Sequence, residues 1–268
     1  MPNGELTRLA IGPAERRDQM LALINDRAFV RVEELSNQFG VSEVTARNDL
    51  TVLAERGQIL RIRGGAIPRA GLGRERPFEE SLSSFAVEKL AIGRAAAGLV
   101  ADGESVIVDV GTTALAAARA LAARTELRDV VVFTNGLKTA LELEPAIPRL
   151  TVIVLGGTLR PLQHSLVDPL ATSVLDQLSV STLLLGCNGV HPTAGITNIN
   201  LPEAQVKRQM LRVARRRVVL ADGSKIGTIE LSHLCGVEDV DLVITGESAD
   251  PQALAALRER AREVQVVR

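Results

Sequence analysis

Short runs of glycine, threonine and asparagine recur at three places in the second part of the sequence, and their chemistry suits the binding of a small anion. They read Asp109-Val110-Gly111-Thr112-Thr113, Thr134-Asn135-Gly136 and Gly156-Gly157-Thr158. Glycine lets a ligand approach the backbone, while threonine and asparagine offer hydroxyl and amide donors. Each run follows an apolar stretch of strand length, and the first two precede predicted helices, whose N-termini present free N–H groups. The runs predict a pocket for a phosphate or another polyoxygenated anion.

A fourth run, Asp222-Gly223-Ser224-Lys225, places a cation beside a carboxylate at another predicted strand end. Lysine is rare in this chain, which has 27 Arg and 4 Lys. Any single run is compatible with an ordinary turn, and Lys225 alone with a surface ion pair, but their recurrence at matching strand ends favours ligand contact. The predicted ligand contacts are Asp109, Gly111, Thr112, Thr113, Thr134, Asn135, Gly136, Gly156, Gly157, Asp222 and Lys225.

Other ligand classes are not indicated. The sequence has neither a GxGxxG nor a GxxxxGK[ST] motif, which disfavours a dinucleotide or a nucleoside triphosphate. The three histidines, His164, His191 and His233, are scattered, so we expect no metal site and no cofactor. Cys187 follows an apolar strand without a histidine nearby in sequence, which favours a small buried residue over a nucleophile.

A second kind of chemistry is indicated near the N-terminus, where a predicted helix has one apolar and one polar face. Ser42 can cap this helix, because its hydroxyl can accept from free N–H groups of the first turn. Ala46, Leu50 and Leu53 share the apolar face, and Gly57 can close the helix. The other face is rich in Thr, Arg and Asn, which can read base edges or grip phosphates.

The stretch Ile59-Leu60-Arg61-Ile62-Arg63 then alternates apolar and cationic residues, and Gly64-Gly65 turns the chain back, which predicts a β-hairpin wing. A small structural or protein-binding domain with solvated arginines is the plainer interpretation. The order of turn, capped helix and cationic wing favours a helix-turn-helix that enters a major groove. The predicted DNA contacts are Ser42, Val44, Thr45, Arg47, Asn48, Thr51, Arg61 and Arg63.

Charge and composition restrict the partners. The formal net charge is −1, yet residues 44–76 hold seven Arg against three acidic residues, so the positive charge that DNA binding needs is local. Aromatic residues make up 2% of the chain, with no Trp or Tyr, which argues against stacking on single-stranded nucleic acid. Residues 1–17 lack the apolar stretch of a signal peptide, and no run is long enough for a membrane span, so we expect a cytoplasmic protein without a membrane partner.

Two domains are predicted around these motifs. The first, residues 1–67, would hold helices at 14–25 and 32–39, the capped helix and the wing. A linker at residues 68–85 is rich in Gly, Pro, Ser and charges. The rest, residues 86–268, alternates strands and helices, which predicts an α/β fold with a mostly parallel sheet. The predicted strands are 106–109, 130–133, 151–155, 182–185, 218–221, 242–245 and 264–267, with helices among others at 114–123 and 203–215.

Over nearly its full length, the chain resembles the DeoR family of bacterial transcription regulators. The first-domain motifs are Glu33-Glu34-Leu35, Val41-Ser42-x-x-Thr45-x-Arg47-x-Asp49-Leu50 and Arg61-x-Arg63-Gly64-Gly65-Ala66. The later motifs are Glu88-Lys89, Asp109-x-Gly111-Thr112-Thr113, Thr134-Asn135, Leu155-Gly156-Gly157 and Asp222-x-Ser224-Lys225. The resemblance implies a winged helix-turn-helix joined to a sensor with the fold of ribose-5-phosphate isomerase and coenzyme A transferases. It also implies repression of carbohydrate genes, relieved by a phosphorylated sugar.

The sequence departs from the family pattern at four positions. Asn48 stands where the family commonly has a second Arg, which bears on operator preference. Gly136 replaces a frequent Ser, Asp168 an often-found Gly, and Gly246 a frequent Asp. Gly136 and Asp168 lie near the predicted pocket, where an added carboxylate disfavours an anion and bears on which effector binds.

Three functions are weighed against each other. The favoured one is a repressor that binds double-stranded operator DNA as a dimer or tetramer, because one winged helix makes few base contacts. The second is a sugar-phosphate isomerase or transferase with an accessory helical domain, using Asp109, Asp222 and Lys225 as acid–base groups. The third is a protein-interaction adaptor, which predicts no salt-sensitive DNA binding.

Overall fold

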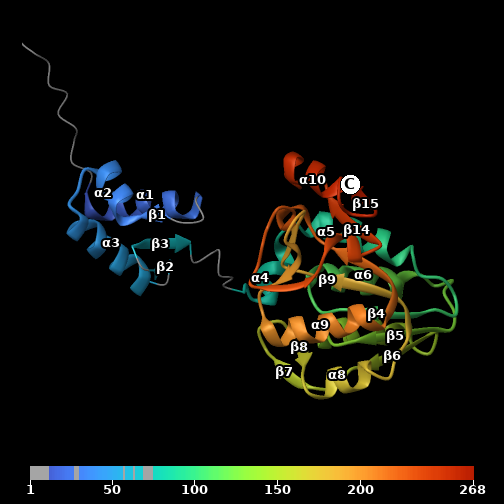
Figure 1. Ribbon diagram of the computed structural model, residues 1–268. Helices are drawn as coiled ribbons and strands as arrows, with labels where there is room; N and C mark the ends of the chain where they lie inside the picture. The colour runs from blue at the N-terminus through green and yellow to red at the C-terminus, as the bar shows by residue number, and fades with distance from the viewer. Residues whose placement is uncertain (1–11, 27–29, 57, 63, 69–74) are drawn as a thin grey trace, which may run out of the picture. The chain divides into compact units, whose positions relative to one another are not determined.

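The computed structural model describes residues 12–26, 30–56, 58–62, 64–68 and 75–268, and the chain forms two compact units, Met1–Arg74 and Glu75–Arg268 (Figure 1). The division falls inside the predicted linker, 68–85. Residues 75–85 belong to the second unit, because Phe78 is buried there and its amide donates to the Leu162 carbonyl at 3.0 Å.

The first unit is a small helical domain with a three-stranded sheet. Its elements are α1 (Pro13–Asp26), β1 (Val30–Arg31), α2 (Val32–Phe39), α3 (Glu43–Glu55), β2 (Ile59–Ile62) and β3 (Gly65–Pro68). The strands lie in the antiparallel order β1-β3-β2, so the predicted wing is confirmed. Its core includes Met20, Ile24 and Leu35 together with the predicted apolar face of α3.

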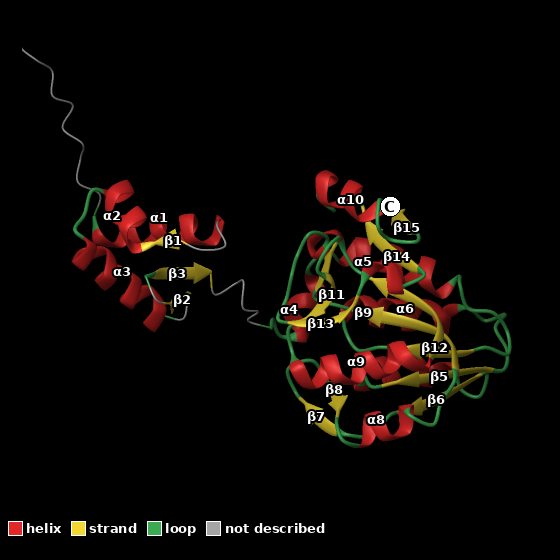
Figure 2. Ribbon diagram, in the orientation of Figure 1, coloured by secondary structure: helices red, strands yellow, loops and turns green. Residues whose placement is uncertain are grey.

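The second unit is built around a seven-stranded parallel sheet in the order β15-β14-β12-β9-β4-β5-β6 (Figure 2). Its strands are β4 (Ser105–Val108), β5 (Val130–Thr134), β6 (Leu150–Val154), β9 (Val180–Gly186), β12 (Ala214–Leu220), β14 (Leu242–Gly246) and β15 (Val264–Val267). The seven predicted strands all lie in this sheet, with some ends shifted, so the predicted α/β class is confirmed.

Helices cover both faces of the sheet. They are α4 (Phe78–Ser83), α5 (Ala86–Ala97), α6 (Thr112–Ala123), α7 (Leu137–Leu143), α8 (Leu170–Leu175), α9 (Leu201–Val213) and α10 (Pro251–Arg258), with short 3-10 turns at Glu144–Ala146, Gly223–Lys225 and Val237–Asp239. Alternate side chains of a strand point to opposite faces. Val106 and Val108 join the core formed with α5, α6 and α7, whereas Ile107 joins the one formed with α8, α9 and α10. The helix predicted at 203–215 ends at Val213, because β12 begins at the next residue.

Two smaller sheets were not predicted. One is the hairpin of β7 (Thr158–Arg160) and β8 (Ser165–Val167). The other pairs β10 (Gly189–His191), β11 (Gly195–Asn198) and β13 (Ser232–Cys235). These strands have three or four residues each, too few for a clear alternation of apolar and polar residues.

Helices α5 and α6 pack with almost no space between their backbones. A Cβ atom added to Gly93 of α5 would lie 2.5 Å from the carbonyl carbon of Ala116 in α6. Alanines fill much of α6, which favours the helix and keeps its surface flat enough for this contact. Position 93 therefore accepts only glycine without movement of one helix.

Among the helices in the described part of the chain, none is both long and apolar enough to cross a membrane.

Candidate functional site

The local geometry at the start of α3 fixes its outer face. Gly40 ends α2 with a φ of 63°, a left-handed conformation that glycine adopts without strain. The Ser42 hydroxyl then accepts from the Thr45 amide at 3.1 Å, so the predicted N-cap is confirmed. Ala46, Leu50 and Leu53 are buried, as expected for the core face.

The opposite face of α3 is exposed, and some of its polar groups are already used. Val44 is 68% exposed, and Asn48 is also exposed. Arg47 forms a solvent-exposed ion pair with Glu43 at 2.9 Å, which costs little to break. Thr51 accepts from Arg61 at 2.8 Å and donates to the Arg47 carbonyl, so the wing strand β2 is linked to the C-terminal half of α3. Arg63, also predicted to contact DNA, lies outside the described residues.

Asp49 has a role that the sequence interpretation missed. It is buried, and its carboxylate binds Arg16 at 2.7 Å with Arg17 at 3.7 Å, which joins α3 to α1. The signal was present, because Asp49 lies three residues after Ala46 and four before Leu53, on the core face. Asp49 therefore holds α3 against α1.

In the second unit, the strand order brings the predicted pocket residues to one edge. β12, β9, β4, β5 and β6 are consecutive neighbours, and their carboxyl ends lead into Asp222, Cys187, Asp109, Asn135 and Gly156 respectively. Ligands of parallel sheets bind at this edge.

Asp109 is at the centre of the site and is fully buried. One carboxylate oxygen, Oδ2, accepts from the Gly186 amide at 3.0 Å and from the Lys207 ammonium. Lys207 also donates to the Gly186 carbonyl at 2.9 Å. Burial by itself lowers the pKa of Lys207, but the Asp109 and Glu203 carboxylates outweigh it and raise that pKa above its ordinary value. The other oxygen, Asp109 Oδ1, is buried without a donor from any described residue and can accept from a ligand hydroxyl.

Several predicted contacts form the floor of the site. The Val110 amide donates to Asn135 Oδ1 at 3.1 Å, and the buried Thr134 hydroxyl accepts from the Gly136 amide at 3.1 Å. A Cβ on Gly157 would lie 2.1 Å from the Val167 carbonyl oxygen, so this glycine permits close packing against β8. These residues shape the edge of the sheet more than they offer free groups.

The N-terminus of α6 remains the open side of this floor. Gly111 has a φ of 123° and precedes the helix, and its Cβ position is free of neighbours. Helix α6 begins at Thr112 without a side-chain cap among the described residues, so its first N–H groups and partial positive charge are available to an anion.

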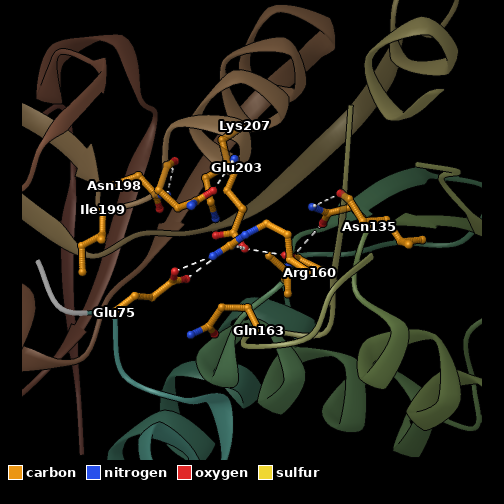
Figure 3. A network of polar contacts seen from close by, with 12 residues as sticks. Glu75, Asn135, Arg160, Gln163, Asn198, Ile199, Glu203 and Lys207 are labelled. Atoms are coloured by element: carbon orange, nitrogen blue, oxygen red, sulfur yellow. Dashed lines mark hydrogen bonds and ion pairs between the residues drawn. The ribbon is translucent and has the colours of Figure 1, made fainter. Parts of the chain in front are cut away.

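Arg160, Glu203 and Lys207 line the site but were not predicted (Figure 3). Helix α9 supplies Glu203 and Lys207 from one face, and strand β7 supplies Arg160. Glu203 accepts from Arg160 and from the Ser165 hydroxyl at 2.5 Å. Arg160 also contacts Glu75, with Nη2 2.6 Å from Glu75 Oε2.

The second cluster lies at the end of β12. The Asp222 carboxylate accepts from the Ser224 amide at 3.2 Å, and its Oδ2 lies 3.7 Å from Lys89 Nζ. The Glu88 carboxylate accepts from the Gly223 amide at 2.9 Å. Lys225 is half-buried, and its ammonium has no hydrogen bond or ion pair with a described residue. Burial lowers the pKa of Lys89, Asp222 opposes that shift and Lys225 adds to it, as expected for two close ammonium groups.

The scarcity of lysine was applied above only to Lys225, but it also bears on Lys89 and Lys207. Of the four lysines, three gather at this edge of the sheet: Lys89, Lys207 and Lys225. Cys187 lies between the clusters, where charges of both Lys207 and Lys225 act on it. Burial nevertheless raises its pKa to about 12, so the thiol stays protonated near neutral pH. The described residues hold no group of His, Cys, Asp and Glu fit for a metal ion.

Comparisons with known proteins match both units to one family. The DeoR-like helix-turn-helix domain matches residues 16–68, and the DeoR C terminal sensor domain matches residues 84–247. The chain is 33% identical over 254 residues to the uncharacterized HTH-type transcriptional regulator YulB of Bacillus subtilis, covering 95% of this chain and 96% of that one.

Two further similarities complete the comparison. The lactose phosphotransferase system repressor of Staphylococcus epidermidis is 29% identical, covering 86% of this chain and 91% of its own. Ribose 5-phosphate isomerase A from Methanocaldococcus jannaschii gives a TM-score of 0.40 at 20% identity, covering 53% of this chain and 55% of that one.

Proposed function

The chain belongs to the DeoR family of transcription regulators, and on that basis we propose that it represses carbohydrate genes until a phosphorylated sugar releases it from its operator. It is a DNA-binding regulator, and its family is not one of enzymes. The name of the lactose system repressor supports a carbohydrate connection. Because a DNA-binding regulator must reach the DNA that it controls, we propose a cytoplasmic location.

One observation carries the proposal of a sugar phosphate. The same edge of the sheet offers donors for a phosphate and an acceptor for a hydroxyl. The donors are the α6 N-terminus, the half-buried Lys225 and the cations Arg160 and Lys207, whereas Asp109 Oδ1 is an acceptor without a described donor. A phosphorylated polyol satisfies both kinds of group at once.

We assign the predicted residues to two roles within this proposal. Arg47, Asn48, Val44 and Thr45 read or grip DNA, while Ser42 and Thr51 support the helix and Arg61 reaches phosphates. In the pocket, Gly111, Thr112, Thr113 and Lys225 contact the effector directly. Asn135, Gly136, Gly156, Gly157 and Asp222 shape its walls.

Replacing Lys225 by Ala is expected to leave operator affinity unchanged and to weaken effector binding by about 10- to 150-fold, because a hydrogen bond to a charged group contributes about 1.5–3 kcal/mol. The effector is chosen as the sugar phosphate with the largest thermal shift in a screen, and its affinity is measured calorimetrically with and without operator DNA. Operator should weaken effector binding by the factor by which effector weakens operator binding. If the effector affinity of the variant equals that of wild type, Lys225 does not contact the effector. If the effector affinity of wild type is the same with and without operator DNA, effector and operator binding are not coupled.

We also propose that the second unit carries the contacts between subunits. β6 is the last strand of the sheet, and exposed apolar side chains gather around it and the neighbouring α8: Ile153, Val154, Leu170 and Val174. Leu170 is 59% exposed and lies against Gly156, two residues after the end of β6. An edge strand with apolar side chains on its surface is suited to pairing with a second copy.

The double variant Val154→Lys/Leu170→Glu is expected to weaken self-association of the full chain at least tenfold, about 1.4 kcal/mol, because each subunit then buries charges in the interface. Light scattering across a concentration series measures this. The control is Val87→Glu, because Val87 is 78% exposed on α5, which packs near β14 and β15 at the other end of the sheet. Equal association of the double variant and wild type would exclude this surface.

A further inference from the structure

The guanidinium of Arg160 is held by two carboxylates that come from distant parts of the chain. Its Nη2 lies 2.6 Å from Glu75 Oε2, its Nη1 lies 3.4 Å from Glu75 Oε1, and Nη1 also contacts Glu203. The side chains of Arg160, Glu75 and Glu203 are 18%, 10% and 5% exposed. The pair with Glu75 thus has the two-pronged geometry that arginine also forms with a phosphate.

The charges around Arg160 do not balance. Asp109, Glu203 and Glu75 are three carboxylates, and among the described residues their ion-pair partners are two cations, Arg160 and Lys207. Burial raises the pKa of Glu75, Arg160 opposes the shift and Glu203 adds to it. A phosphate that entered while Glu75 stayed would add further negative charge to this excess, so the two anions exclude each other.

Glu75 is also the first residue of the second unit, and residues 76–78, which follow it, are bonded to the turn of the hairpin that carries Arg160. The Phe78 amide donates to the Leu162 carbonyl at 3.0 Å, and Gln163 donates to the Arg76 carbonyl at 2.7 Å. Phe78 packs edge-on against His164, with ring centroids 5.6 Å apart. The position of Arg160 is therefore coupled to residues 75–78, and Figure 3 shows the contact of Glu75 with Arg160.

We infer that Glu75 is a tethered substitute for the effector's phosphate, which takes Arg160 from Glu75 and so loosens residues 75–78 at the start of the second unit. This inference rests on the proposed function and names its switch. Without ligand, Glu75 satisfies Arg160 and fixes the segment. With ligand, the phosphate replaces Glu75 on Arg160, and residues 75–78 lose the ion pair that holds their first residue.

The test uses the full chain and inorganic phosphate as the probe. Glu75→Gln keeps the size of the side chain and removes its charge, so phosphate should bind at least tenfold more tightly by calorimetry. Glu79→Gln is the matched control, because Glu79 lies four residues later, is 60% exposed and pairs with Lys138 rather than Arg160. Its phosphate affinity should stay within twofold of wild type.

Amide exchange supplies the second readout. Saturating phosphate should speed exchange at residues 75–79 in wild type, whereas Glu75→Gln should exchange fast there without phosphate. Glu75→Ala repeats both measurements if the first variant misfolds. An unchanged phosphate affinity in the folded variants, or slower exchange with phosphate in wild type, overturns the inference and leaves the proposed function standing. Failure of wild type to bind phosphate or any sugar phosphate overturns both.

Discussion

Replacing Lys207 by Met is expected to lower the free energy of unfolding of the second unit by about 3–5 kcal/mol, the usual cost of leaving a buried charge without its partner. Lys207 and Asp109 are 3% and 0% exposed, so the remaining carboxylate could not be solvated. Urea denaturation of the full chain, followed by amide exchange in β4 and α9, measures the loss. Because the folded pKa of Lys207 is raised, its contribution is complete below a pH of about 10 and is lost only as the pH rises beyond it.

Two further variants separate charge from packing. Lys207→Met combined with Asp109→Asn removes both charges and should recover part of the lost stability. Lys138→Met removes a surface ion pair with Glu79 and should cost at most about 1 kcal/mol. If Lys207→Met proves no more harmful than Lys138→Met, the buried pair does not hold β4 and α9 together.

The second large effect is expected on DNA binding. Arg47→Ala and Asn48→Ala should each weaken the operator complex by about 1–3 kcal/mol and relax its sequence preference, as the loss of a base contact does. Both side chains are exposed on the outer face of α3, and the ion pair of Arg47 with Glu43 is easily exchanged for DNA. Fluorescence anisotropy with operator and scrambled duplexes measures both effects.

The wing gives the contrasting case. Arg61→Ala should weaken operator and scrambled DNA alike and reduce the slope of log affinity against log salt by about 1, as expected for a phosphate contact. Arg119→Ala, which removes an exposed ion pair with Glu142 in the second unit, is the control and should change neither. If operator affinity survives both Arg47→Ala and Asn48→Ala, α3 is not the recognition helix.

The sheet could be predicted from the sequence because each of its seven strands contains a short stretch rich in apolar residues, even where, as in β12, three arginines precede it. Of the residues that the strand order gathers at the carboxyl ends of the strands, the sequence could indicate those that directly follow a strand, as Asp109 and Asn135 do. Lys207 could not be placed, because it reaches Asp109 across 98 residues of sequence from the middle of a helix. Arg160 lies on a three-residue strand with no apolar pattern to reveal it. Which charged residues pair across a long stretch of sequence depends on the tertiary structure. A single sequence shows that Lys207 and Arg160 are present but not which carboxylates they contact.

The contact between Gly93 and Ala116 makes the two sides of the pocket unequal. Because α6 cannot approach or turn against α5 without a collision, its N-terminus already has a fixed position before the proposed anion binds. That side loses little conformational entropy on binding. The opposite side, on the β7–β8 hairpin, is held by the ion pairs of Arg160 with Glu75 and Glu203, and the proposed switch exchanges the pair with Glu75 for a phosphate. In the proposed switch, the α6 N-terminus would therefore set effector affinity, whereas the β7–β8 hairpin would set the release of residues 75–78. A substitution near the α6 N-terminus could then change affinity without changing that release.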